Sequence, residues 1–296
     1  MPNIPIFLSS DNNYAPFVAT TIASICDNTK SFCEFYILDG GISQENQAKI
    51  CELKKQFSNF EIEFIKIDLE NKFKNYKAMF HYTSTTYARL FIPDLKQDIK
   101  KVLYSDVDVI VIGDIKEMFE EDLQQYIIGA VPESFLGRKA QLAYNNTYNL
   151  SILHKPFSAG NLIIDCEKWR NQQITKQLLH IYHTKKEDNF NDQTLLNIYF
   201  DNSYKELHQK YCYTIQHDVC LQSKDIIICH YNGPIKPWHI DKDTQTKLMP
   251  FLEIFWSYAK KTAFFKHLCE KCDIMEQKRL LQKLKVFRIM SKKLSL

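Results

Sequence analysis

Two aspartates one residue apart are the strongest chemical signal in the sequence. Asp106-Val107-Asp108 follows an apolar run at residues 102–104 that predicts a buried strand. Side chains two residues apart in an extended chain point the same way, so the two carboxylates would lie together. They would repel each other unless a cation lay between them, and such oxygen ligands suit Mg²⁺ or Mn²⁺. The motif predicts a divalent-metal site, although one aspartate could instead cap a turn while the other faces solvent.

A second polar cluster begins where another apolar run ends. Residues 226–229 predict a strand, and His230 follows them directly. An imidazole ligand suits Mn²⁺ better than Mg²⁺. Gly233 would let the backbone approach a ligand closely, and Lys236 offers a positive charge for a phosphate. A lone histidine at a strand end is usually structural, but together with the paired aspartates this cluster predicts part of a binding site.

An α/β fold would position these groups. Short apolar runs predict strands at residues 4–8, 35–38, 60–67, 102–104, 127–131, 162–164 and 226–229. Helical spacing predicts helices at residues 14–28, 43–57, 82–91 and 191–200, and again from about residue 240 to the end. The opening alternation of strands and helices is typical of a parallel sheet with helices on both faces. Because such sheets bind ligands at the carboxyl ends of their strands, the loop at residues 9–14 is predicted to contact a nucleotide.

Charge and composition limit the classes of partner. The chain has 296 residues, of which 45% are hydrophobic and 25% charged, as in ordinary soluble proteins. Residues 260–296 contain 11 Lys and Arg against 3 acidic residues, a charge of +8, whereas the remainder carries −5. A mildly acidic body argues against nucleic-acid binding. The N-terminus lacks the charged leader and apolar run of a signal peptide, so we expect a cytoplasmic protein.

The nine cysteines give no disulfide pattern. Their number is odd and their spacing scattered, so reduced, mostly buried thiols are expected. Cys269 and Cys272 form a Cys-x-x-Cys with His267 nearby, but a zinc site would need further ligands.

Several short motifs resemble a known enzyme family. The paired aspartates after Lys-Val-Leu-Tyr-Ser, with His-Tyr-Asn-Gly-Pro-Ile-Lys-Pro-Trp starting at residue 230, resemble family 8 retaining glycosyltransferases. The likeness is strongest to bacterial lipopolysaccharide α-galactosyl- and α-glucosyltransferases. Further similar segments lie at residues 10–15, 85–90, 157–165 and 191–193. In order and spacing, the resemblance covers most of residues 1 to about 240.

The resemblance implies a fold and a reaction. The fold would be GT-A: a Rossmann-like, mixed but mostly parallel sheet with helices on both faces. The reaction would transfer galactose or glucose from a UDP-sugar to a lipopolysaccharide-type glycan or glycolipid acceptor, with Mn²⁺ or Mg²⁺ as cofactor. The new bond would keep the α configuration of the donor.

The resemblance also implies roles for particular residues. Asp106, Asp108 and His230 would ligate the metal. Other implied contacts are Asp11 and Asn13 to uridine, Arg89 and Asp192 to the sugar, and Gly233 and Lys236 to the diphosphate. Gln193 would lie beneath the anomeric carbon. Because Gln193 is no strong nucleophile, we expect front-face attack by the acceptor on an oxocarbenium-like centre.

Two positions depart from the family pattern. Ser158 stands in the donor site where the family often has asparagine, and Glu133 stands where aspartate is usual. Both changes leave the sugar identity of the donor open.

The C-terminal segment is predicted to be a basic amphipathic helix. We expect a transferase domain at residues 1–255 and a membrane-attachment segment at residues 256–296. The apolar side chains predicted to share one side are Leu280, Leu281, Leu284, Phe287 and Leu294. Such a helix can lie on an anionic surface, here the inner face of the cytoplasmic membrane. The alternative is a helix packed on the body with its basic face in solvent.

Two other functions remain open from the residues alone. Haloacid-dehalogenase-like phosphatases also place Asp-x-Asp after a buried strand and use the first aspartate as nucleophile. They need a later lysine and a second acidic pair, whereas here the last strand ends in His230. A non-catalytic sugar-binding relative would keep the fold but lose turnover.

Overall fold

The computed structural model describes residues 3–67, 84–133, 138–184, 191–214, 225–246, 248–270 and 274–294, without the side chains of residues 274, 275 and 287–294. The strands are β1 Ile4–Ser10, β2 Cys33–Asp39, β3 Phe60–Lys66, β4 Lys101–Ser105, β5 Val109–Val111, β6 Ile128–Pro132, β7 Phe157–Asp165, β8 Lys205–Glu206, β9 Tyr213–Thr214 and β10 Ile228–His230. The α-helices are α1 Ala15–Asn28, α2 Gln44–Cys51, α3 Ile92–Leu95, α4 Lys116–Phe119, α5 Arg138–Tyr148, α6 Cys166–Asn171, α7 Ile174–Thr184, α8 Asp192–Phe200, α9 Leu252–Ala259, α10 Phe265–Glu270 and α11 Ile274–Leu294. The short 3-10 helices are η1 Asn12–Tyr14, η2 Glu52–Lys55, η3 Ser84–Phe91, η4 Gln209–Tyr211 and η6 Pro237–His239. Among these helices, none is both long and apolar enough to cross a membrane.

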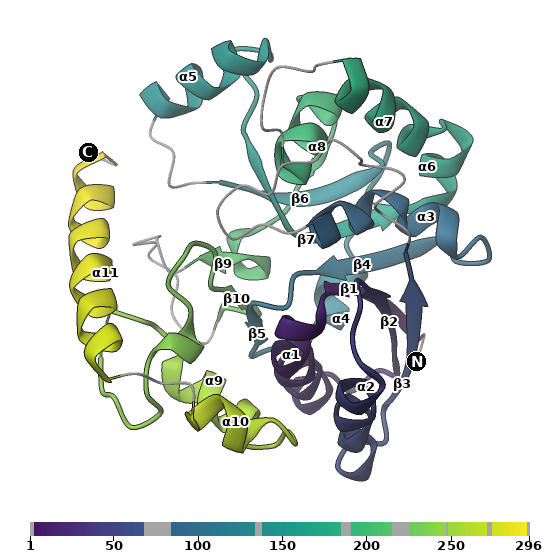
Figure 1. Ribbon diagram of the computed structural model, residues 1–296. Coiled ribbons are helices and arrows are strands. Elements are labelled where there is room, and N and C mark those ends of the chain that lie inside the picture. Colours follow the sequence, from purple (N-terminus) through teal and green to yellow (C-terminus); the bar gives the residue numbers. More distant parts are fainter. Residues whose placement is uncertain are drawn as a thin grey trace.

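A seven-stranded mixed sheet forms the centre of the molecule (Figure 1). Its strand order is β3-β2-β1-β4-β7-β6-β8. Strands β1 to β4 pair in parallel, whereas β7 runs antiparallel to both of its neighbours, β4 and β6. The expected mixed, mostly parallel sheet of a GT-A fold is therefore confirmed.

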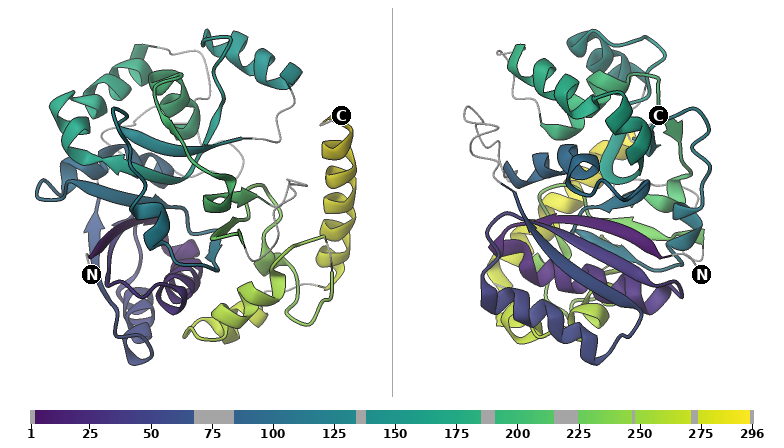
Figure 2. Two further views of the ribbon diagram at one scale, coloured as in Figure 1. Left: turned by 180° about the vertical axis from the view of Figure 1, so that it is seen from behind. Right: turned by 90° about the vertical axis from the view of Figure 1, so that its right-hand side faces the viewer.

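Helices cover both faces of this sheet, as Figure 2 shows. On β1, Ile4, Ile6 and Leu8 belong to a core cluster shared with α1, while Phe7 belongs to a second cluster shared with α6, α7 and α8. Because both faces are buried, β1 is an unbroken apolar run instead of an alternating one. This burial on two sides holds the carboxyl ends of β1 and β4 at one fixed edge.

A smaller three-stranded sheet, ordered β5-β10-β9, brings His230 at the end of β10 back to that edge. Strand β10 pairs antiparallel with β5, with His230 opposite Val109. The Tyr231 backbone N–H donates to the Asp108 carbonyl oxygen at 2.9 Å. Residues more than 100 positions apart therefore become neighbours through backbone pairing.

Most predicted elements are present, with informative differences. The strand predicted at residues 162–164 is only the end of the nine-residue β7, whose first half contains the small residues Ser158, Ala159 and Gly160. The helix predicted at residues 82–91 is the 3-10 helix η3 from Ser84, and residues 82–83 lie outside the described part. Helices α5, α6 and α7 were not predicted.

The C-terminal helices are anchored on the body. Helix α9, within which residue 255 lies, packs on α1, and the Asn28 side-chain amide lies 2.6 Å from the Tyr258 hydroxyl. At the start of α11, the Gln277 side chain accepts from the Asp241 backbone N–H and donates to the Thr244 hydroxyl, both at 2.8 Å. Leu284 is only 4% exposed and belongs to the main core cluster. The expectation that Leu284 faces lipid is wrong, because its side chain is already buried against the protein.

We expect Leu284→Ala to destabilise the protein by roughly 2 to 4 kcal/mol, because a buried leucine leaves a cavity when truncated. Val286, two residues further on and 56% exposed, provides the matched control. Val286→Ala should change the free energy of unfolding by no more than about 0.5 kcal/mol. Urea unfolding monitored by circular dichroism measures both, and equal small effects would show that α11 does not pack on the core.

Candidate active site

A cavity of about 410 Å³ opens at the carboxyl ends of β1 and β4. Ten of the eleven predicted site residues line it: Asp11, Arg89, Asp106, Asp108, Ser158, Asp192, Gln193, His230, Gly233 and Lys236. Asn13 is not among the lining residues, and its side chain is exposed. Sequence motifs spread over more than 200 positions therefore meet around one space.

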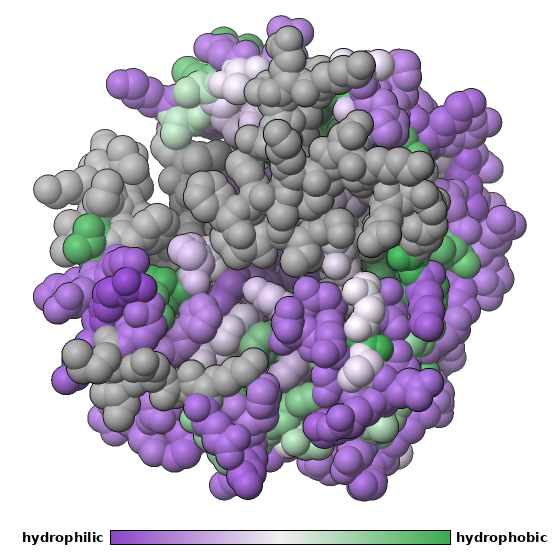
Figure 3. All heavy atoms as spheres, in the orientation of Figure 1, coloured by the Kyte–Doolittle hydropathy of each residue, from purple (hydrophilic) through white to green (hydrophobic). Residues whose placement is uncertain are grey.

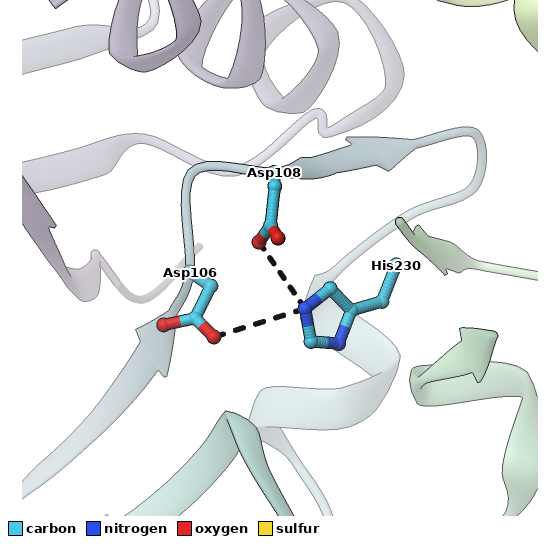
Figure 4. A group of neighbouring side chains, drawn as sticks. All are labelled: Asp106, Asp108 and His230. Atoms are coloured by element: carbon cyan, nitrogen blue, oxygen red, sulfur yellow. Dashed lines mark ion pairs between the residues drawn. The ribbon is translucent and has the colours of Figure 1, made fainter. Parts of the chain in front are cut away.

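The two aspartates and the histidine face one another within this cavity (Figure 4). The His230 Nε2 atom lies 3.1 Å from Asp108 Oδ1 and 3.7 Å from Asp106 Oδ2. One ligand atom from each of the three residues lies within 4.8 Å of the others. Among the described residues, this is the one group of three or more acidic, histidine or cysteine side chains with such spacing.

The backbone around the aspartates is held by hydrogen bonds. The Asp106 N–H donates to the Gly160 carbonyl oxygen at 2.7 Å. The Thr21 hydroxyl, on buried α1, lies 3.1 Å from the Val107 carbonyl oxygen and 3.2 Å from that of Val109. The bend that follows β4 is thus tied to two different elements, so the carboxylates are presented on a fixed loop.

Gly160 makes room for the histidine ring. A Cβ at this position would lie 2.3 Å from His230 Cε1 and 2.9 Å from Asp106 Oδ2. Real Cβ atoms do not approach other atoms so closely, and the ring and carboxylate are both fixed by their own contacts. The glycine in Phe-Ser-Ala-Gly-Asn therefore allows β7 to pass directly beneath the site.

Two cations neutralise the paired carboxylates. The Lys236 ammonium lies 2.5 Å from Asp108 Oδ2, and the Arg89 guanidinium lies 2.9 Å from Asp106 Oδ1. Burial opposes ionisation of Asp108, but the charges of Lys236 and His230 hold its pKa well below the usual value. Burial likewise opposes the charged form of His230, but Asp108 raises the histidine pKa above its usual value. The cluster is thus held together by strong mutual attraction.

Arg89 also pairs with Asp192 at the cavity wall. The Arg89 Nε atom lies 2.8 Å from Asp192 Oδ2, and both side chains are 5% exposed. Burial raises the pKa of Asp192, and the adjacent Arg89 charge opposes that rise. The Arg89 guanidinium also lies 4.4 Å from the Tyr104 ring centroid, while the Tyr104 hydroxyl donates to Asp106 Oδ1 at 2.7 Å. These contacts fix the orientation of Arg89 beneath the cavity.

The Gln193 amide is held at both ends. Its oxygen accepts from the Ala159 backbone N–H at 3.1 Å, and its nitrogen donates to Glu133 Oε1 at 2.9 Å. Burial raises the pKa of Glu133 to about 7. A carboxyl group that is easily protonated near neutrality therefore lines the same cavity as Gln193.

On the opposite side, Asp11 forms part of a tight turn. Its carboxylate accepts from the Asn13 and Tyr14 backbone N–H groups at 2.9 and 3.1 Å. Trp238, the tryptophan of the segment that starts at His230, is stacked on Phe17 with ring centroids 3.5 Å apart. It is 9% exposed and packs in the core.

The donor set fits a divalent ion. Two carboxylates and an imidazole suit Mn²⁺, and the cavity beside them leaves space for phosphate oxygens. The glycine beneath the ring gives the three side chains the room to converge.

The Cys-x-x-Cys pair lies far along the chain from these residues. Cys272 is outside the described residues, so a zinc site at this pair is not tested.

Some site residues were missed from the sequence. The sequence singled out Glu133 only because the family usually has aspartate at that position. Glu133 follows the buried strand β6, so the rule that ligands bind at the carboxyl ends of strands also predicts it as a site residue. Tyr104 and Gly160 act through contacts that only the fold reveals. Cys212, which lies 3.5 Å from His230 Nδ1, carries no sequence signal of its own.

Comparisons with known proteins give the family of the chain. Residues 5–242 match the family described as glycosyl transferase family 8. A putative glycosyltransferase of Haemophilus influenzae is 32% identical over 245 residues, covering 79% of this chain and 72% of that protein. The lipopolysaccharide 1,3-galactosyltransferase of Salmonella typhimurium is 26% identical over 248 residues, covering 77% of this chain and 71% of that protein.

Solved structures show the same fold. The galactosyltransferase LgtC, solved in complex with donor and acceptor sugar analogs, superposes with a TM-score of 0.76. It is 26% identical, and the match covers 88% of this chain and 96% of that chain. The fold is GT-A, and a phosphatase is not favoured. From the matched length and the arrangement of its strands, the chain belongs to glycosyl transferase family 8.

Proposed function

We propose that the protein transfers galactose or glucose from a UDP-sugar to a lipopolysaccharide-type glycan acceptor with retention of configuration and with Mn²⁺, or Mg²⁺, as cofactor. The observation that carries this proposal is the convergence of Asp106, Asp108 and His230 in one cavity. The names of the Salmonella relative and of LgtC support a hexose donor and a glycan acceptor.

The metal and diphosphate would occupy one side of the cavity. Asp106, Asp108 and His230 would hold the ion, which when bound acts as a Lewis acid toward the departing UDP. Lys236 would add a positive charge for the diphosphate beside Asp108. Gly233 has φ +102° and would let the backbone approach the phosphates. Asp11 and Asn13 would contact uridine.

The sugar would lie toward the Arg89–Asp192 pair and Ser158. A buried, charge-compensated carboxylate such as Asp192 can accept hydrogen bonds from sugar hydroxyls in a fixed direction. Gln193 is neutral, and its amide is hydrogen-bonded at both ends. An amide so placed favours attack by the acceptor on the same face as the departing UDP over formation of a covalent intermediate on Gln193.

The first test is a panel of UDP-sugars incubated with Mn²⁺, with and without a lipooligosaccharide-type acceptor. We expect slow hydrolysis of UDP-galactose or UDP-glucose without acceptor, and an α-linked product with acceptor. NMR of the initial product gives the anomeric configuration. A β-linked product would exclude retention, and phosphate release from an aryl phosphate without sugar transfer would favour a phosphatase.

The second test concerns the metal ligands. Asp106→Ala, Asp108→Ala and His230→Ala should each lower turnover by about 10²- to 10³-fold, because each removes stabilisation of the charge on the leaving group. Asp243→Ala is the matched control, since that carboxylate has a side chain 78% exposed and does not line the cavity. Turnover at saturating Mn²⁺ reports the effect. Near wild-type turnover of the His230 variant would exclude His230 as a ligand.

We further propose a division into a transferase domain at residues 1–255 and an attachment segment at residues 256–296, which would hold the protein on the inner face of the cytoplasmic membrane. Leu284 is buried, so attachment would depend on the exposed cations of α11. These are Lys278, Arg279, Lys283 and Lys285. In Figure 3 the described atoms over α11 are mostly purple, with some green atoms beside them.

The tail is tested by changing these four residues to glutamine instead of truncating the chain, because Phe264 and Leu268 are core residues that truncation would remove. Each cation near an anionic surface contributes about 1 kcal/mol, so the four changes should weaken vesicle binding by up to roughly 10³-fold. Sedimentation with phosphatidylglycerol vesicles at low salt measures this.

The control for the tail carries four glutamines at exposed lysines elsewhere in the chain, namely Lys30, Lys54, Lys55 and Lys176. It should bind these vesicles as the wild type does. An equal loss of vesicle binding in both variants would indicate a nonspecific effect of net charge. If the wild type does not bind the vesicles, the basic face of α11 faces solvent and the membrane proposal is wrong.

A further inference from the structure

A buried thiol lies behind the histidine of the metal site. Cys212 Sγ is 3.5 Å from His230 Nδ1, the ring nitrogen on the side away from the two aspartates. Cys212 is 2% exposed and His230 is 4% exposed. Cys212 does not belong to the group of Asp106, Asp108 and His230 that could hold a metal ion. It contacts one member of that group, His230, from behind.

The contact with Cys212 bears on which ring nitrogen of His230 carries the proton. The Nε2 atom faces Asp106 and Asp108, so a metal held by all three residues would use the Nε2 lone pair. The ring proton must then be on Nδ1. Metal-ligating histidines almost always donate that second N–H to a fixed acceptor, which sets both tautomer and ring orientation. Here the acceptor that faces Nδ1 is the Cys212 sulfur.

The thiol is itself held in place. The Asn161 side-chain amide donates to Cys212 Sγ at 3.4 Å, and the Asn161 oxygen accepts from the Ser105 hydroxyl at 2.8 Å. Ser105 immediately precedes Asp106. A buried chain of contacts, Ser105 to Asn161 to Cys212 to His230, therefore joins the two halves of the metal site.

The remaining contact of the thiol leads into the cavity. The Cys212 thiol donates to the Ser158 hydroxyl oxygen at 3.7 Å. The Gly160 backbone N–H donates to the same oxygen at 3.3 Å. With two donors directed at it, the Ser158 oxygen has its own hydroxyl proton available for a ligand in the cavity that it lines. The thiol thus connects His230 to the residue that replaces the family's usual asparagine.

We propose that Cys212 is a positioning residue that holds His230 in the tautomer and orientation needed to bind the metal ion. The inference rests on the proposed metal site. Cys212 is not among the residues that line the cavity, so its effect on the metal ion would pass through His230. Loss of an outer hydrogen-bond partner of this kind typically lowers metal affinity by about 10- to 100-fold.

The test compares Mn²⁺ affinity among variants, measured by electron paramagnetic resonance titration in the presence of UDP. Cys212→Ala removes the sulfur, and Cys212→Val removes it while keeping most of the volume. Both should weaken Mn²⁺ binding by roughly 10- to 100-fold. Cys212→Ser keeps a donor and an acceptor and should restore most of the affinity. If the alanine variant does not fold, the valine variant supplies the comparison.

Cys166→Ala is the matched control, because Cys166 is a buried thiol whose sulfur donates to the Ile164 carbonyl oxygen, away from His230. It should lower the melting temperature as much as Cys212→Ala does, yet leave Mn²⁺ affinity unchanged. Wild-type affinity in both Cys212→Ala and Cys212→Val would overturn the positioning role alone. A wild-type protein that binds no Mn²⁺ would overturn the metal site and, with it, this inference.

Discussion

The mutual repulsion of Asp106 and Asp108 is the constraint on which the site depends. Two carboxylates on one short loop, partly removed from water, are stable only when opposite charges compensate them. Lys236 and Arg89 lie against one aspartate each, and His230 lies between the pair. Arg89 comes from one segment of the chain, and His230 and Lys236 come from another, so the charge balance is available only to the completed fold. The same excess of negative charge is what would attract a divalent ion.

The antiparallel strand β7 gives the site its floor. An all-parallel sheet would continue from β4 with another crossover, but β7 instead runs back past the end of β4. Its Gly160 carbonyl fixes Asp106, and its missing Cβ admits the His230 ring. The side chains of Ser158 and Asn161, on the same strand, continue the network toward Cys212. Strand β7 therefore pairs with β4, leaves room for the His230 ring and supplies side chains that hydrogen-bond to Cys212.

The C-terminal helices show how one amphipathic segment divides its surface. The apolar side of α11 contributes Leu284 to the core, while the side chains of Lys278, Arg279, Lys283 and Lys285 stay exposed. Burial of a leucine side chain stabilises by about 1.5 to 3 kcal/mol, whereas burying an unpaired lysine would be far more costly. Packing on the protein therefore uses an apolar residue of the helix and leaves these cations at the surface.

The sequence alone indicated most of the strands of the main sheet, several helices, the paired aspartates and the histidine, because apolar periodicity and strand-end polar residues are local patterns. It also indicated the family, through motifs whose order matches. What only the tertiary structure decided is which distant groups touch. The Gln193 amide clamp by Ala159 and Glu133, the cradle at Gly160 and the thiol behind His230 join residues 18 to 70 positions apart. No local pattern encodes such contacts, since they follow from strand pairing and from the packing of helices and strands that are distant in the sequence. The tail illustrates the same limit, because helical periodicity predicts an apolar side but not whether protein or lipid covers it.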